Sequence, residues 1–110
     1  MEIDFKENCR IITPLSPKLT EWETLRLAEE ISCNAGLRTA LDMSCVCDCT
    51  IDFIEGIKKY KNISMFNINS DIFAILISMD LDKTIKLFVS EIDFLNDKHQ
   101  LLNRNFTVIH

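Results

Sequence analysis

Three cysteines at alternate positions are the most conspicuous reactive side chains in this sequence. Cys45, Cys47 and Cys49 lie in the string Ser-Cys-Val-Cys-Asp-Cys-Thr. On an extended segment, a period of two would place all three thiols on one face. Thiolates gathered in this way bind metal ions or take part in redox chemistry, with Asp48 or His99 available as a further ligand.

The spacing of these cysteines favours packing over metal binding. Structural zinc sites use C-x₂-C pairs, which a C-x-C-x-C string lacks. Cysteine also behaves as a small hydrophobe that is often buried beneath a helix, and we interpret His99 as a partly buried structural side chain. A chain of 110 residues with five cysteines needs no disulfide framework. We therefore expect no metal and no cofactor, and a Cys-dependent metal or redox protein is the third hypothesis.

Acidic and basic side chains flank the same segment. Asp48, Asp52 and Glu55 resemble an acid–base set or a Mg²⁺ site, but acids near a helix start are favoured by the helix dipole alone. The string Lys58-Lys59-Tyr60-Lys61 closes the predicted helix, where cations are favourable, and so needs no anionic ligand. No nucleophile–base pair stands out, and with only 2 Gly the sequence has no phosphate-binding glycine loop. We predict a protein that is not an enzyme.

Charge and hydropathy restrict the partners and the cellular location that we expect for this protein. A net charge of −5 argues against a nucleic-acid partner, because neutralising phosphates requires clustered Lys and Arg. The longest apolar run, Ile72–Ile77, is far shorter than the ~20 residues that span a bilayer. The acidic N-terminus lacks the apolar segment of a signal peptide. We expect a cytoplasmic protein without membrane insertion.

The cysteine segment lies between a predicted strand and a predicted helix. Leu37–Met43 is short and mostly apolar, as in a buried central strand. The helix runs from about Thr50 to Tyr60, with Ile51, Ile54 and Ile57 at helical spacing. The segment therefore joins the carboxyl end of a strand to the start of a helix.

Short strands alternate with helices along the rest of the chain. A hairpin is predicted over Glu2–Phe5 and Cys9–Thr13, with further strands at Ile63–Ile68 and Ile85–Val89. The first helix begins with a capping box of Thr20 and Glu23, the third near Ser70 and the fourth after Ser90. Their predicted apolar stripes consist of Trp22, Leu25, Ala28 and Ile31 in the first helix and Ile92, Leu95 and Leu102 in the fourth.

This order of elements predicts an α/β fold. Each later strand is followed by a helix, so right-handed crossovers give a largely parallel sheet with an antiparallel edge from the hairpin. We expect a single domain over residues 1–110, with a mixed sheet of four to five strands and about four helices. Residues 103–110 form a C-terminal tail or an extra strand.

Several strings resemble the STAS family, small domains of bacterial anti-sigma-factor antagonists that are also appended to sulfate transporters. Residues 41–46 read Leu-Asp-Met-Ser-Cys-Val where the family has a string like LDLSGV. Residues 79–82 read Met-Asp-Leu-Asp where it has a Thr-Gly-Leu-Asp type turn. Residues 86–91 read Lys-Leu-Phe-Val-Ser-Glu, a strand that runs into a Ser-capped helix as in the family. The resemblance implies a STAS-like domain over nearly the whole chain.

The resemblance also implies a phosphorylation site. The regulators of the family carry a loop near Asp-Ser-Ser-Gly, and a dedicated kinase phosphorylates its second Ser. If Asp48 matches the family's Asp, then Cys49 and Thr50 occupy the Ser positions and Ile51 replaces Gly. A gap-free alternative places Ile51 or Asp52 at the acceptor position, and no phosphorylation switch would then exist.

Two functional hypotheses follow from the resemblance. The first is an anti-sigma-factor antagonist that switches partners, acts in signal transduction and transcription regulation, and is a phosphoprotein. Its partner is an anti-sigma factor kinase and Thr50 is its phosphoacceptor. The alternative is a constitutive assembly subunit, for example of a lipid-transporting ABC complex or a signalling scaffold, without phosphorylation. The residues expected to bind the partner are Asp48, Cys49, Thr50, Ile51, Asp52, Ile54 and Glu55.

Overall fold

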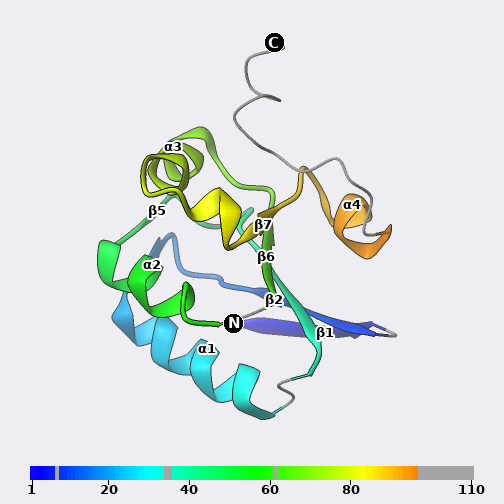
Figure 1. Ribbon diagram of the computed structural model, residues 1–110. Coiled ribbons are helices and arrows are strands. Elements are labelled where there is room, and N and C mark those ends of the chain that lie inside the picture. Colours follow the sequence, from blue (N-terminus) through cyan, green and yellow to red (C-terminus); the bar gives the residue numbers. More distant parts are fainter. Residues whose placement is uncertain (7, 34–35, 61, 97–110) are drawn as a thin grey trace.

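The chain begins with an antiparallel hairpin, as its two short strands separated by a polar turn predict. Strand β1 (Glu2–Lys6) pairs with β2 (Cys9–Thr13), with Glu2 opposite Thr13 and Lys6 opposite Cys9. The computed structural model describes residues 1–6, 8–33, 36–60 and 62–96 (Figure 1). The predicted His99 and Leu102 and the C-terminal segment 103–110 lie outside the described residues.

The remaining strands of the main sheet follow β2 in parallel, each paired with the one before it. Strands β4 (Arg38–Asp42), β6 (Ile63–Phe66) and β7 (Lys86–Leu87) complete a five-stranded sheet of order β1-β2-β4-β6-β7. The pairs β2–β4, β4–β6 and β6–β7 are all parallel. The expected mixed, mostly parallel sheet is confirmed, and β4 is its central strand.

Helices cover the two faces of this sheet unequally. Helices α1 (Glu21–Cys33), α2 (Ile51–Ile57) and α3 (Ser70–Ser78) lie on one side in Figure 1, whereas α4 (Glu91–Asn96) lies on the other. A 3₁₀ turn, η1 (Leu81–Lys83), follows α3. The described chain is thus an α/β domain with four α-helices, as predicted. None of these helices is long and apolar enough to cross a bilayer.

Two apolar clusters correspond to the two faces. The larger contains Leu27, Leu41, Phe53, Ile57 and Leu76, and lies between the sheet and the first three helices. The smaller cluster packs beneath α4 and consists of Cys9, Ile11, Ala40, Phe66, Phe88 and Phe94. Within residues 1–6, 8–33, 36–60 and 62–96, α4 is the only helix on that side of the sheet.

Side-chain caps begin the helices at the places that the sequence predicts. Glu23 Oε2 accepts from the Thr20 backbone N–H (3.4 Å) and Thr20 Oγ1 accepts from the Trp22 N–H (3.3 Å), so each side chain satisfies one backbone donor, as the predicted capping box requires. Asn69 caps α3, its Oδ1 accepting from the Ile72 N–H at 2.8 Å. These bonds satisfy backbone donors that the first helical turn leaves without partners.

The predicted apolar stripe of α1 is only partly correct, and that of α4 is wrong for its described residues. Trp22 is 71% exposed and Leu25 is 59% exposed, whereas Ile31 is buried as predicted, together with Leu27, which the predicted stripe did not include. In α4, Ile92 and Leu95 are exposed, whereas Phe94 is fully buried. Both helices carry apolar side chains on more than one face. Contact with the sheet, which periodicity alone does not show, decides which face is buried.

A buried arginine joins two strands to α1. Arg10 is fully buried in β2, and its Nη1 donates to the carbonyl oxygen of Glu30 at 2.5 Å. Its Nε and Nη2 donate to Thr39 Oγ1 on β4 at 3.2 and 3.0 Å. A cation that donates to a carbonyl near the end of a helix also interacts favourably with the helix dipole.

Candidate functional site

The cysteine segment runs from the carboxyl end of β4 to the start of α2 and is held by backbone hydrogen bonds. Strand β5 (Asp48–Cys49) pairs in parallel with β3 (Lys18–Leu19). The carbonyl oxygen of Pro17 accepts from the N–H groups of Cys47 (2.7 Å) and Asp48 (3.1 Å). These bonds place the start of α2 beside the start of α1.

Asparagine side chains fasten the same segment to α3. Asn69 Nδ2 donates to the carbonyl oxygens of Val46 (3.1 Å) and Cys47 (3.0 Å) while its Oδ1 caps α3. Asp42 Oδ1 accepts from Asn67 Nδ2 at 3.1 Å. The segment therefore follows one defined path between three elements.

The three cysteines do not share a face, so that prediction is wrong. Cys45 and Cys47 are exposed, whereas Cys49 is 7% exposed and packs into the larger core cluster. The extended pairing covers only two residues of the segment, so the period of two does not hold along it. Burial, followed by the charge of Asp48, raises the pKa of the Cys49 thiol to about 11.

This arrangement gives no support to metal chemistry at the cysteines. A thiol with a raised pKa is neutral near neutral pH, and metals bind the thiolate form. Among residues 1–6, 8–33, 36–60 and 62–96, no three His, Cys, Asp or Glu side chains are grouped so that they could hold a metal ion. Asp48 and the three cysteines are close in sequence, but in the described structure they are not grouped as metal ligands.

Thr50 is the N-cap of α2. Its backbone is extended (φ −83°, ψ 159°), and its Oγ1 accepts a hydrogen bond from the Phe53 N–H at 3.2 Å. Its backbone N–H donates to the carbonyl oxygen of Leu19 at 2.9 Å. The expected position of Thr50 at the start of a helix is confirmed, and its side chain is partly exposed.

Only some of the expected partner-binding residues can contact a partner. Ile51 is 63% exposed, and Asp48 and Asp52 are exposed as well. Ile54 is fully buried and Cys49 is almost so, which means that including these two was wrong. Helix α2 is short and turns Phe53, Ile54 and Ile57 toward the sheet. Glu55 is partly exposed and forms an ion pair with Lys58.

The structure adds residues of α1 that the sequence analysis assigned to the core. Helices α1 and α2 pack closely where Gly56 meets Thr24: a Cβ on Gly56 would lie 2.3 Å from Thr24 Cγ2. Trp22 and Leu25 stand on the outward side of α1. In the sequence, nothing near Trp22 or Leu25 distinguishes a solvent-exposed apolar residue from a buried one. We define the α1–α2 face as the exposed or partly exposed side chains of Trp22, Leu25, Thr50, Ile51, Asp52 and Glu55.

A shallow cavity lies beside α1 at Trp22. It has a volume of about 230 Å³, with Pro14, Leu15 and Arg26 also in its lining. Leu15 is itself 51% exposed. Apolar surface thus continues from Trp22 into a hollow.

No protein-family model matches the sequence, and the search of curated proteins finds no match.

Proposed function

We propose that this chain is a non-enzymatic regulator of STAS type that binds a protein partner through the α1–α2 face. The observation that carries the proposal is Trp22, which is 71% exposed on a helix packed beside the Thr50 segment. Exposed tryptophans are favourable centres of protein interfaces, because a large rigid ring buries much apolar area at little entropic cost. Leu25 and Ile51 supply further apolar area on the same two helices.

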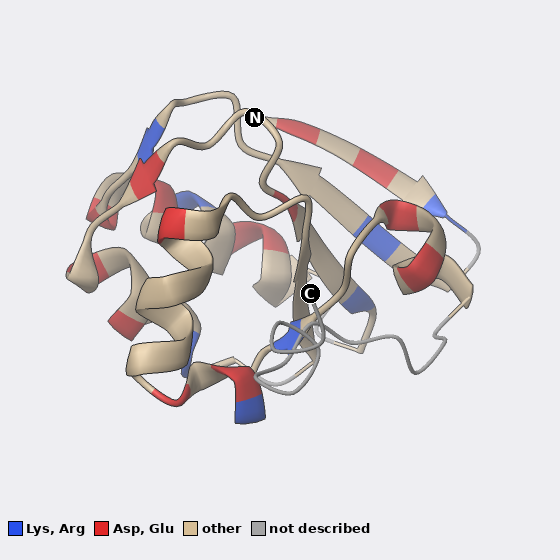
Figure 2. Ribbon diagram, turned by 90° about the horizontal axis from the view of Figure 1, so that it is seen from above, with Lys and Arg blue, Asp and Glu red and all other residues tan. Residues whose placement is uncertain are grey.

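The charge of this face indicates the chemistry of the partner. Glu21 and Asp52 lie in the first turns of α1 and α2, Asp48 precedes α2 and Glu55 lies further along it. Figure 2 shows the acidic residues of the domain in red, on helices as well as strands. Complementary potentials favour a partner that surrounds an apolar contact with Lys and Arg. The partner implied by the STAS resemblance, an anti-sigma factor kinase, is the one we propose.

Thr50 is the proposed phosphoacceptor on this face. Phosphorylation adds about −1.5 to −2 charges, and the added charge would lie between Asp48 and Asp52. In the free protein this charge is solvated, but in a docked interface it meets desolvation and the repulsion of the neighbouring carboxylates. Phosphorylation would therefore release the partner.

Two further features support the STAS assignment. Asp80 follows α3 in a left-handed conformation (φ 57°, ψ 26°) at the turn where the family commonly has Gly, and Asp tolerates this conformation better than most residues. All five cysteines are free, as is usual in a reducing cytoplasm. We propose the cytoplasm as the site of action.

The proposal is tested by two substitutions that cap α2 equally well but differ in charge. Asn and Asp are both good N-cap residues, so Thr50→Asn and Thr50→Asp each preserve the helix start. Calorimetric titration would use the histidine-kinase-like anti-sigma factors encoded by the same genome. We expect Thr50→Asn to bind as the unmodified protein does and Thr50→Asp to bind at least ~10-fold more weakly. Equal affinities of the two variants would refute the switch.

Ile51 favours a second candidate, an assembly subunit without a switch. The family's loop has Gly at this position, and here a bulky, 63% exposed side chain replaces it. In that case Trp22→Ala would still weaken partner binding, whereas Thr50→Asp would not. The two substitutions together therefore distinguish loss of docking from loss of switching.

A further inference from the structure

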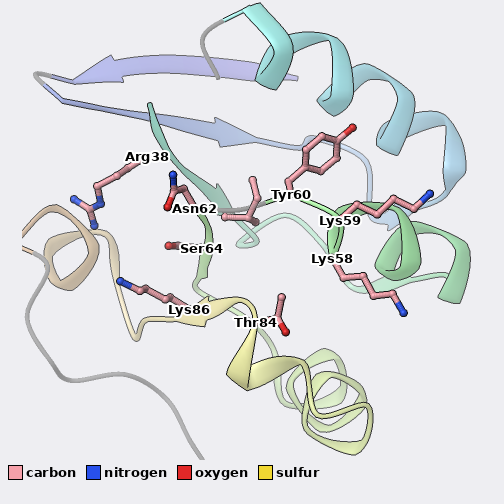
Figure 3. Close-up of a pocket in the computed structure, with 9 residues that line it drawn as sticks. Arg38, Lys58, Lys59, Tyr60, Asn62, Ser64, Thr84 and Lys86 are labelled. Atoms are coloured by element: carbon pink, nitrogen blue, oxygen red, sulfur yellow. The ribbon is translucent and has the colours of Figure 1, made fainter. Parts of the chain in front are cut away.

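Polar side chains gather on the α4 side of the sheet, at the amino ends of its parallel strands. Ser64 is paired with Ala40 on one side and Lys86 on the other, so these three residues share a face. Ala40 belongs to the cluster beneath α4, which identifies that face. Arg38 precedes Ala40 by two residues and lies on the same side. Figure 3 shows Asn62 between Arg38 and Ser64.

Among the described residues, a cavity remains beside helix α4 at this end of the sheet. Phe94 of α4 packs on Phe66 and Phe88, which lie further along the strands. The cavity of about 450 Å³ occurs at the amino ends, and its lining includes Arg38, Asn62, Ser64 and Lys86. In Figure 3 the side chains of Arg38 and Lys86 extend to the same side, with the Ser64 hydroxyl between them. We call these four residues the basic corner.

The basic corner is unusual for this chain and for this position. Ser64 lies within β6, an interior parallel strand, and such strands are normally apolar on both faces. The chain has a net charge of −5, yet four of its 12 basic residues line the cavity and none of the described lining residues is acidic. A concentration of positive charge in an acidic protein indicates an anionic ligand.

The four Lys and Arg residues that line the cavity have different surroundings. They are Arg38, Lys58, Lys59 and Lys86. Arg38 is held in place: its Nη2 donates to the carbonyl oxygen of Phe94 at 3.0 Å, and its guanidinium lies 4.5 Å from the centre of the Phe94 ring. Lys58 pairs with Glu55, and in Figure 3 Lys58 and Lys59 extend away from the basic corner. Lys86 forms no ion pair with any described residue.

We propose that the basic corner binds the phosphate group of a small phosphate-bearing molecule, such as a phosphomonoester or a nucleotide. A guanidinium, an ammonium, a hydroxyl and an amide together supply charged and neutral donors, as phosphate recognition requires. A cavity of about 450 Å³ falls within the range of small-molecule sites and exceeds the needs of a bare phosphate. The carboxyl end of α2 near Lys58 repels an anion, which places the phosphate near Arg38 and Lys86.

This site is separate from the proposed partner interface. The basic corner lies at the amino ends of β4 and β6, whereas Thr50 follows the carboxyl end of β4. Failure of either proposal leaves the other standing. Ligand binding at the corner would give the domain a second, small-molecule input.

The test is an amide NMR titration of the ¹⁵N-labelled full chain with inorganic phosphate, pyrophosphate and AMP at constant ionic strength. We expect saturable shifts centred on Ser64 and Lys86, with AMP or pyrophosphate binding more tightly than phosphate. Lys86→Gln should weaken the affinity about 10-fold or more, because a charge-assisted hydrogen bond is lost. Lys83→Gln is the matched control, since Lys83 is exposed on the adjacent η1 turn and does not line the cavity.

Three results would overturn the proposal. Shifts that rise linearly without saturation indicate general ionic effects, and shifts centred away from the corner indicate another site. Equal weakening by Lys83→Gln and Lys86→Gln indicates nonspecific attraction. Circular dichroism checks that each variant folds, and Ser64→Ala gives a second variant that leaves both cations in place and should also weaken binding.

Discussion

Cys49 differs from its neighbours because it alone of the three turns into the core. Its pKa of about 11 keeps the thiol neutral at pH 8, while Cys45 and Cys47 are exposed. We predict that iodoacetamide at pH 8 modifies Cys45 and Cys47 within the time in which Cys49 stays unmodified. Peptide mass spectrometry of the folded protein measures this, and labelling in denaturant provides the control. Rapid modification of Cys49 in the folded state would contradict the burial described here.

Because the pKa of Cys49 is raised in the folded state, the free energy of unfolding depends on pH. The folded state holds the protonated thiol more strongly than the unfolded state, whose Cys pKa is about 8.5. The stabilisation is therefore complete below about pH 8.5 and is lost as the pH rises toward 11. We expect Cys49→Ala to lessen the fall in unfolding free energy over this range. Denaturation at several pH values, compared between the two proteins, tests it.

At the scale of elements, the contact between α1 and α2 depends on one glycine. A Cβ at Gly56 would lie 2.3 Å from Thr24 Cγ2, well inside contact distance. We expect Gly56→Ala to destabilise the protein by roughly 1–3 kcal/mol, despite the better helix propensity of Ala. Thr24→Ser removes the methyl group but keeps a hydroxyl, and it should recover much of the loss in the double variant. Urea denaturation would compare the unsubstituted protein, the two single variants and the double variant. Additive changes in the free energy of unfolding would contradict a contact between the two helices at this point.

Local signals predicted where elements begin, but not which side of a helix is buried. Thr20 with Glu23, and Thr50 before its helix, act through hydrogen bonds within three residues, so sequence spacing reveals them. The burial of Ile54 and the exposure of Trp22 depend on how α1 and α2 meet the sheet. Periodicity in a helix with apolar residues on several sides does not contain that information.

At the scale of the whole molecule, Arg10 links β2, α1 and β4. Its bonds to Glu30 and Thr39 span 20 and 29 residues of sequence. We expect Arg10→Met, which keeps much of the volume, to lower the unfolding free energy by roughly 1.5–3 kcal/mol, because it removes charged hydrogen bonds to buried groups. Lys6→Met on the same hairpin is the control, since Lys6 is exposed, and it should have little effect. Equal effects of the two substitutions would show that Arg10 does not stabilise the fold.

The two candidate sites lie at opposite ends of the same sheet and differ in how visible they are in the sequence. The Thr50 segment is continuous in the chain, so its acids, thiols and hydroxyl could be considered together. The basic corner combines residues 38, 62, 64 and 86, which only the strand register and the turns that precede the strands bring together. The run of lysines after α2 is typical of a helix end, and Lys58, the C-cap of α2, forms an ion pair with Glu55 of that helix.

The central claim is that a protein partner docks on the α1–α2 face. The most direct test is an NMR footprint on the ¹⁵N-labelled protein as an unlabelled anti-sigma factor kinase is added. We predict that the Trp22 indole N–H and the amides of Leu25, Ile51 and Asp52 shift or broaden, while those of Ser64 and Lys86 keep their positions. A footprint on the α4 side of the sheet with an unchanged Trp22 indole would contradict the claim.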